Sequence, residues 1–150
     1  MNNFRYILLF LPFLAFACGT NERQTGRSEN NIDAARNFIR AALDGKFNEA
    51  RTYLVADSTN TNWMDVAERS YEKSDQATKD GYRTASINIH RVDPVNDSTT
   101  IIIFSNSFKN DHDTLKVLRI KGQWLIDLKY LYEHDMDTLH IPGNKIDSVK

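Results

Sequence analysis

The spacing of hydrophobic residues changes once along this chain, near Tyr82. Before that point, apolar residues recur every three or four positions, which is the spacing of one face of a helix. After it, apolar and polar residues alternate, as they do in strands with one buried face. The sequence therefore predicts helices in the first part of the domain and strands in the second.

The first part predicts two helices in close succession. Residues 32–43 carry a clear apolar face, and Asn30 or Asn31 can cap the start of this helix. Gly45 can end it in a left-handed turn. Residues 47–54 repeat the pattern over a shorter stretch and predict a second, short helix.

A third helix is expected after a polar break over residues 57–62, with Thr61 or Asn62 as its cap. Its apolar face is formed by Trp63, Val66, Ala67 and Tyr71. Residues 74–81 are polar and are expected to form a last turn or a loop.

The second part predicts four strands, over residues 85–92, 99–108, 114–120 and 123–131. Turns are expected at residues 94–97 and 109–111, and Lys121-Gly122 is typical of a tight hairpin. Helices followed by such a meander indicate an α+β domain, with the N-terminal helices packed on one face of a curved, antiparallel, four-stranded sheet.

The N-terminus has the features of an export signal. Arg5 is followed by an uncharged apolar run over residues 6–16. A membrane-spanning helix needs roughly 18 apolar residues, whereas the core of a signal peptide needs about 7–15. Ala15 and Ala17 provide the small residues of a cleavage site, and Cys18 follows directly. Residues 1–17 are therefore predicted to be a signal peptide.

Ala17-Cys18 after such a leader resembles the lipobox of bacterial lipoproteins, although Leu14 stands one place early and Phe16 is bulky. The resemblance implies that the Cys18 thiol is acylated with fatty acids such as palmitate. The alternative is ordinary secretion with a free thiol. Cys18 is the only cysteine, so it has no disulfide partner within the chain, which favours lipidation.

These features divide the chain into four parts. Residues 18–31 are polar and predicted to be a flexible tether above the membrane. Residues 32–132 form the α+β domain, and residues 133–150 form a polar tail. The net charge is −1, and no basic stripe with interleaved aromatics is present, which excludes nucleic acid as a partner.

Two short segments carry a second resemblance. The helix opening around Asp44-Gly45-Lys46-Phe47 and the hairpin ending Lys121-Gly122-Gln123-Trp124 resemble small Bacteroidetes-type lipoproteins with a nuclear-transport-factor-2-like, or cystatin-like, domain. Many such families have no assigned function. The resemblance covers about residues 32–131 and implies a conical hollow between helices and sheet, which relatives use as a ligand pocket or an active site.

Aromatic residues at helical and strand spacing are the candidates for lining such a hollow. They are Phe38, Tyr53, Trp63, Tyr71, Trp124 and Tyr130. The alternative is that these side chains pack in the core.

A catalytic dyad of His90 with Asp127 is conceivable by residue type. The alternation of their strands, however, predicts that both point to solvent unless a bulge reverses the order. No Gly-x-Ser-x-Gly elbow and no phosphate-binding glycine loop is present. No cofactor is expected, and the sequence favours a binding protein over an enzyme.

Two clusters combine histidine with carboxylates, as metal sites do. One spans residues 133–140 in the tail. The other is Asp111-His112-Asp113, which the demands of a hairpin turn explain equally well. We expect neither to be a metal site.

A repeated pattern of Asp followed by Ser or Thr is similar to the O-glycosylation signal of exported Bacteroidetes-type proteins. The alternative is that these residue pairs simply favour turns and strand starts. The acceptor hydroxyls would belong to Ser58, Ser98, Thr114, Thr138 and Ser148.

The expected function is that of a non-enzymatic envelope lipoprotein that binds a small apolar ligand or a partner protein through its hollow or sheet face. An isomerase- or hydratase-type enzyme and an accessory structural subunit are the alternatives. Glu22 alone is acidic near the predicted anchor, which gives little support for surface display. We therefore expect a periplasm-facing position on the outer membrane.

Replacing Cys18 with alanine tests the anchor. Two or more acyl chains give stable membrane attachment, so Cys18→Ala protein is expected in the soluble fraction and wild-type protein in the membrane pellet. Fractionation of the native host followed by immunoblotting measures the distribution. A Cys18→Ala protein that still pellets wholly with membranes would refute lipid anchoring.

Overall fold

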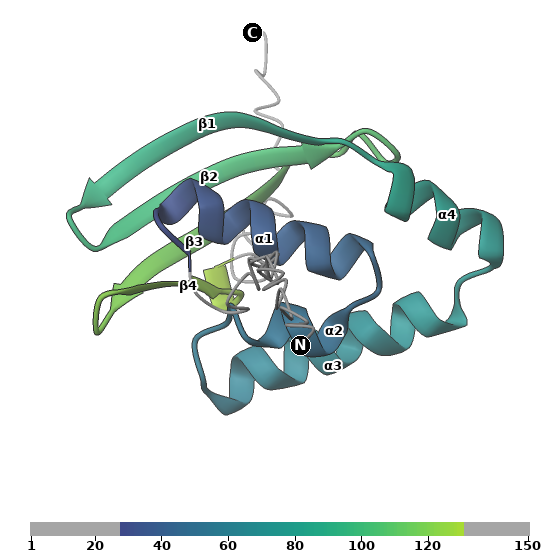
Figure 1. Cartoon of the computed structure of the whole chain (residues 1–150), viewed down its shortest axis with the longest axis horizontal. Coiled ribbons are helices and arrows are strands. Elements are labelled where there is room, and N and C mark those ends of the chain that lie inside the picture. Colours follow the sequence, from purple (N-terminus) through teal and green to yellow (C-terminus); the bar gives the residue numbers. More distant parts are fainter. Residues whose placement is uncertain (1–27, 131–150) are drawn as a thin grey trace, which may run out of the picture.

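The computed structural model describes residues 28–130. The predicted leader, Cys18, most of the predicted tether and the tail lie outside these residues. The described part is an α+β fold in which helices precede an antiparallel sheet with strand order β1-β2-β3-β4 (Figure 1). The predicted class, helices followed by a four-stranded meander, is confirmed.

The elements follow one another with short connections. The helices are α1 (Asn31–Leu43), α2 (Phe47–Arg51), α3 (Ser58–Lys73) and α4 (Gln76–Thr84). The strands are β1 (Ile87–Asn96), β2 (Thr99–Asn106), β3 (Asp113–Ile120) and β4 (Gln123–Asp127).

Helix α1 begins where the sequence predicts. The side chain of Asn30 accepts a hydrogen bond of 2.9 Å from the backbone N–H of Asp33, which satisfies one of the free donors at the helix start. Ser28 is also buried, and its hydroxyl accepts from the Asn37 side chain at 3.4 Å. The last residues of the segment predicted as a tether therefore belong to the folded domain.

Helix α1 lies between the curved sheet and the α2–α3 pair, so it is covered on both sides (Figure 1). Ala34, Ala35 and Ala41 are almost completely buried, and their small side chains let the helix approach its neighbours closely. The core continues onto the sheet through the buried side chains of Ile102, Phe104, Leu115, Val117 and Ile126.

Two helix boundaries differ from the prediction, and both differences come from capping. Helix α3 begins at Ser58 because the Asp57 side chain accepts from the Asn60 N–H at 2.8 Å. Residues 76–84 form α4, where Asp75 accepts from the Thr78 N–H at 2.7 Å. The polar stretches predicted as a break and as a turn or loop are helix starts, so those predictions were wrong.

The second helix and the last strand are shorter than predicted. Helix α2 ends at Arg51, and the next residues pair with β4 in a parallel bridge between Leu54 and Ile126. The Ile126 N–H donates to the Tyr53 carbonyl at 2.8 Å, and the Val55 N–H donates to the Ile126 carbonyl at 2.9 Å. This short segment covers the free edge of β4, which ends at Asp127.

The opposite edge of the sheet is β1, which is longer than predicted and continues through Pro94 to Asn96. The turn predicted at residues 94–97 therefore shifts to Asp97-Ser98. Proline has no N–H to donate, so it is tolerated on an edge strand. The pairing with β2 is interrupted between Ile89 and Arg91 and between Pro94 and Asn96.

Arg40 fixes the position of α4 relative to α1. Its guanidinium donates to the backbone carbonyls of Ala85 at 2.8 Å and Tyr82 at 3.1 Å, at the C-terminal end of α4. It also pairs with Asp44 at 2.9 Å. A cation at the C-terminus of a helix satisfies free carbonyls and complements the helix dipole.

Two glycines adopt positive φ where the sequence predicts turns. Gly45 ends α1 with φ 74°, and Gly122 has φ 80° in the β3–β4 hairpin, where Lys121 has φ 50°. This pair of positive angles is what a tight hairpin of the Lys-Gly type requires. Around Gly122 there is open space, whereas a Cβ on Gly45 would lie 2.7 Å from the ring of Tyr71.

Alanine substitutions at these glycines separate backbone strain from steric conflict. Gly122→Ala is expected to cost about 1 kcal/mol from positive φ alone. Gly45→Ala is expected to cost at least about 1 kcal/mol more, because the Tyr71 ring must also move. Urea unfolding of both variants measures the difference. Equal losses of stability would show that Tyr71 does not restrict Gly45.

Candidate functional site

Two neighbouring hollows lie in the described residues, and the larger of the two opens at one end of the helix–sheet layer, with a volume of about 440 Å³. This larger hollow is bounded by α1, α3, α4, β2 and the β2–β3 connection. Its lining is Phe38, Ile39, Ala42, Leu43, Ala67, Tyr82, Phe104, Asn106, Lys109, Asp111 and Asp113.

The lining of the larger hollow is divided by element. Every lining residue from the helices is apolar or aromatic, whereas the charged residues all come from the β2–β3 connection and the start of β3. Apolar walls with a few polar groups on one side are typical of sites for small organic ligands, and the volume lies in their usual range.

The β2–β3 connection has a defined conformation. The Asn106 side chain accepts from the N–H groups of Phe108 at 3.2 Å and Lys109 at 2.9 Å. The Asn110 N–H donates to the Asn106 carbonyl at 2.8 Å, and Asn110 adopts φ 60°, which asparagine tolerates well. Buried Asn106 thereby orders the segment that carries the charged rim of the larger hollow.

A second, smaller hollow of about 260 Å³ lies next to the first and shares Ala42, Leu43, Ala67 and Tyr82 with it. It extends between the helices and is also lined by Phe47, Ser70, Tyr71 and Ser74. The shared residues make the two hollows neighbours along one apolar wall.

A row of aromatic rings runs beside these hollows. The ring centroids of Phe47 and Tyr71 lie 5.4 Å apart, those of Tyr71 and Tyr82 6.3 Å, and those of Tyr82 and Phe108 5.1 Å. Phe108 reaches α4 because Gly81 has no side chain: a Cβ there would collide with the Phe108 ring. The row joins α2, α3 and α4 to the β2–β3 connection.

The aromatic residues predicted from the sequence are not all gathered at one site. Phe38 lines the larger hollow and Tyr71 the smaller one. Trp63 lies on a separate surface hollow with Thr59, Asn62 and Val66. Tyr53 is buried in the core, Trp124 packs partly buried against it, and Tyr130 is half-buried at the end of the described residues.

Sequence reasoning missed Ala42, Ala67, Tyr82, Lys109 and Asp111 as lining residues. The available signal was the two alanines, since a small residue on the inner face of a helix leaves space where a larger side chain would pack. The sequence places Lys109 and Asp111 in a turn, and nothing in their spacing distinguishes the rim of a hollow from an ordinary loop.

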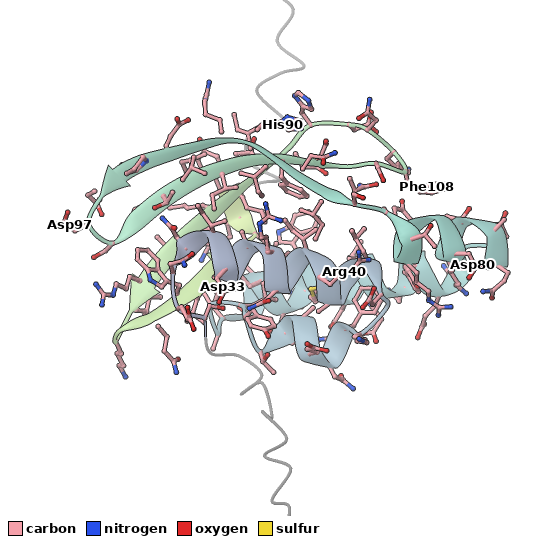
Figure 2. All side chains as sticks on the ribbon, turned by 45° about the horizontal axis from the view of Figure 1, so that its top comes forward. Asp33, Arg40, Asp80, His90, Asp97 and Phe108 are labelled. Atoms are coloured by element: carbon pink, nitrogen blue, oxygen red, sulfur yellow. The ribbon has the colours of Figure 1, made fainter. Side chains whose placement is uncertain are left out.

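The conceivable dyad of His90 and Asp127 is not formed. The two residues belong to β1 and β4, which are the opposite edges of the sheet. His90 is exposed and points away from the helices (Figure 2). Its Nε2 lies 2.8 Å from the Ser105 hydroxyl, and its ring stacks on His112 with centroids 4.2 Å apart.

Asp127 was predicted to point to solvent, but it is buried and only 6% exposed, so that prediction was wrong. The strand ends here beneath the start of α3, beside the completely buried Asn60, whose Nδ2 donates to Asp127 at 3.5 Å. Asn60 also accepts from the Leu128 N–H at 2.7 Å and donates to Asp57 at 2.9 Å. Lys129 lies 2.8 Å from Asp57 and 3.6 Å from Asp127.

This polar network connects the N-terminus of α3 to the end of β4, and it shifts the pKa values of Asp57 and Lys129. The Asn60 backbone N–H, followed by Lys129, lowers the pKa of Asp57 below its usual value. The hydrogen bond to Asp57 raises the pKa of Lys129. The network holds α3 and β4 together, and none of its residues lines either hollow.

The remaining sequence candidates are scattered. In residues 28–130, no group of three or more His, Cys, Asp or Glu side chains is arranged to hold a metal ion, and the predicted tail cluster lies outside that range. Among the hydroxyls considered for glycosylation, Ser58 and Ser98 are exposed and Thr114 is half-buried. Thr138 and Ser148 lie outside the described residues, as does Cys18.

Comparison with known proteins gives no relative: no family model, no curated protein and no solved structure matches this chain. Among the helices of residues 28–130, none has the length and apolar character needed to span a bilayer.

Asp57→Asn tests the charge in the polar network, since asparagine caps a helix about as well as aspartate. The pKa of Asp57 is lower in the folded state, so its carboxylate stabilises the fold above the unfolded-state pKa of about 3.9, and this is lost as the pH falls further. Wild type should exceed Asp57→Asn in stability at pH 7, and the difference should shrink below about pH 4.

Urea unfolding of both proteins between neutral and acidic pH measures this difference. Parallel stability curves across the whole pH range would contradict a stabilising role for the Asp57 charge.

Proposed function

We propose that this chain is a membrane-anchored envelope lipoprotein whose domain binds a small, largely apolar ligand in the larger hollow. The observation that carries the proposal is the lining of that hollow, in which α1, α3 and α4 contribute only apolar and aromatic side chains. The leader and Cys18 in the sequence support the anchor, by which the protein would be attached to the outer membrane facing the periplasm.

Binding is favoured over catalysis by the placement of the polar groups. An acid–base mechanism of the isomerase or hydratase type needs at least two polar groups within hydrogen-bond reach of each other inside the cavity. Lys109 and Asp111 are exposed at the rim, and Asp113 is partly buried at the start of β3. The side chain of the buried Asn106 accepts hydrogen bonds from the backbone of its own turn. His90 lies on the other face of the sheet, and buried Asp127 lies in the network with Asn60.

We also propose that the domain has a nuclear-transport-factor-2-like, or cystatin-like, architecture. The element order supports this assignment, with the helices first and a meander sheet afterwards. So does the curvature of the sheet over α1 (Figure 1). A hollow lies at one end of this helix–sheet layer. In such an architecture the hollow is the natural place for a ligand.

A second candidate function, docking of an envelope protein on the outer sheet face, is supported by the side chains that alternate with the core. Ile101 and Ile103 flank the buried Ile102 and therefore project from the face opposite α1. Leu118 and Leu125 are paired across β3 and β4 on the same face. All four side chains are only partly buried.

Filling the larger hollow tests the ligand proposal. Ala42→Phe places a ring on the wall shared by both hollows, whereas Ala77→Phe adds the same ring at an exposed site on α4. The probe is N-phenyl-1-naphthylamine, whose fluorescence rises in an apolar site. Full-length Cys18→Ala protein allows the titration without detergent.

Wild-type background and Ala77→Phe are expected to bind the dye alike, and Ala42→Phe is expected to bind about tenfold more weakly, a difference of about 1.4 kcal/mol. Circular dichroism of each variant checks that the fold is intact. Equal dye binding by a folded Ala42→Phe protein would place the apolar site elsewhere.

A further inference from the structure

The charges around the larger hollow are of both signs and lie on one side only. Lys109 and Asp111 are two residues apart in the β2–β3 connection, and both side chains are exposed at the rim. Asp113 follows at the start of β3. On the opposite side, Phe38, Ala42 and Leu43 and their neighbours on α3 and α4 carry no charge.

Lys109 and Asp111 are not paired with charged side chains of the described residues. Among the ion pairs formed by residues 28–130, none involves the side chain of Lys109 or of Asp111. Both residues are held near each other by the ordered turn, in which Asn106 accepts from the Lys109 N–H and Asn110 adopts positive φ. The rim therefore presents two exposed groups of opposite charge, Lys109 and Asp111, beside an apolar wall, with the partly buried Asp113 next to them.

We infer that the ligand of the larger hollow is a single-chain amphiphile with a zwitterionic head group, an inference that rests on the proposed ligand-binding function. The apolar chain contacts the walls formed by α1, α3 and α4. The head group lies at the β2–β3 connection, with its cationic part toward Asp111 and its anionic part toward Lys109. Charge complementarity of this kind fixes the orientation of a ligand more than its total affinity.

The smaller hollow gives the chain room to continue. It shares Ala42, Leu43, Ala67 and Tyr82 with the larger one and extends away from the charged rim toward Tyr71. The polar residues that line only this smaller hollow are Ser70, Tyr71 and Ser74, all uncharged. Charge at one end and apolar walls toward the other match the two ends of an amphiphile.

The test uses four probes that share a decyl chain and differ only in the head group: decylphosphocholine, decyl maltoside, decyltrimethylammonium and decyl sulfate. Each is titrated below its micelle concentration against full-length Cys18→Ala protein, by displacement of N-phenyl-1-naphthylamine. Decylphosphocholine is expected to bind about fivefold more tightly than the uncharged maltoside, because exposed ion pairs are individually weak. The preference should shrink at high salt.

Variants at the rim separate the head-group interaction from the chain interaction. Lys109→Gln and Asp111→Asn are expected to remove most of the preference for decylphosphocholine and to leave decyl maltoside binding unchanged. Lys73→Gln, exposed at the end of α3 and outside both hollows, is the matched control and should retain the preference.

The outcomes distinguish this inference from the function on which it rests. If all four probes bind alike, or if a singly charged head group binds best, the zwitterionic assignment is overturned while apolar binding in the hollow stands. If no decyl probe displaces the dye, or if Ala42→Phe protein binds the probes as well as its parent does, the proposed function falls as well.

Discussion

The close packing of α1 between the sheet and the other helices is the constraint on which the rest of the structure depends. Ala34, Ala35 and Ala41 make this possible, because a larger side chain at any of these buried positions would push the layers apart. The N-terminal part of α1 is packed on both sides, whereas Ala42 and Leu43 at its C-terminal end border open space. The hollow is therefore the place where this packing stops.

Interactions at the ends of the helices hold that open space in shape. Arg40 binds the carbonyls that end α4, and the row of aromatic rings links α4 to α3 and to Phe108. At the other end, Asn60 joins α3 to β4. Because each wall is fastened by its own contacts, the hollow is preformed, and a ligand would meet little cost in ordering it.

The sequence predicts those parts of the fold that depend on local periodicity. The helical face of residues 32–43, the apolar run around Ile102 and the Lys121-Gly122 hairpin all lie where their patterns indicate. The wrong helix boundaries come from residue types that favour two different local structures. Asp57 and Asp75 favour loops and also cap helices, and only the N–H groups that they accept from decide which applies.

The candidate site was harder to predict because it depends on contacts between distant parts of the chain. Asp127 is buried by Asn60, which lies 67 residues earlier, so strand alternation alone could not indicate its environment. The large aromatic side chains drew attention, but most of them fill the core or lie elsewhere. The hollow is bordered instead by Ala42 and Ala67, whose side chains are small. A pattern of hydrophobic and polar positions does not show where small side chains leave space unfilled.

The two edges of the sheet have a consequence for how the protein meets its neighbours. The edge of β4 is covered by residues 53–55, and the edge strand β1 contains Pro94 and two irregularities in its pairing with β2. Free strand edges invite another chain to add on through its backbone. Two copies of this domain brought side by side would therefore meet no regular, uncovered strand edge within residues 28–130, so contact between them would depend on their side chains.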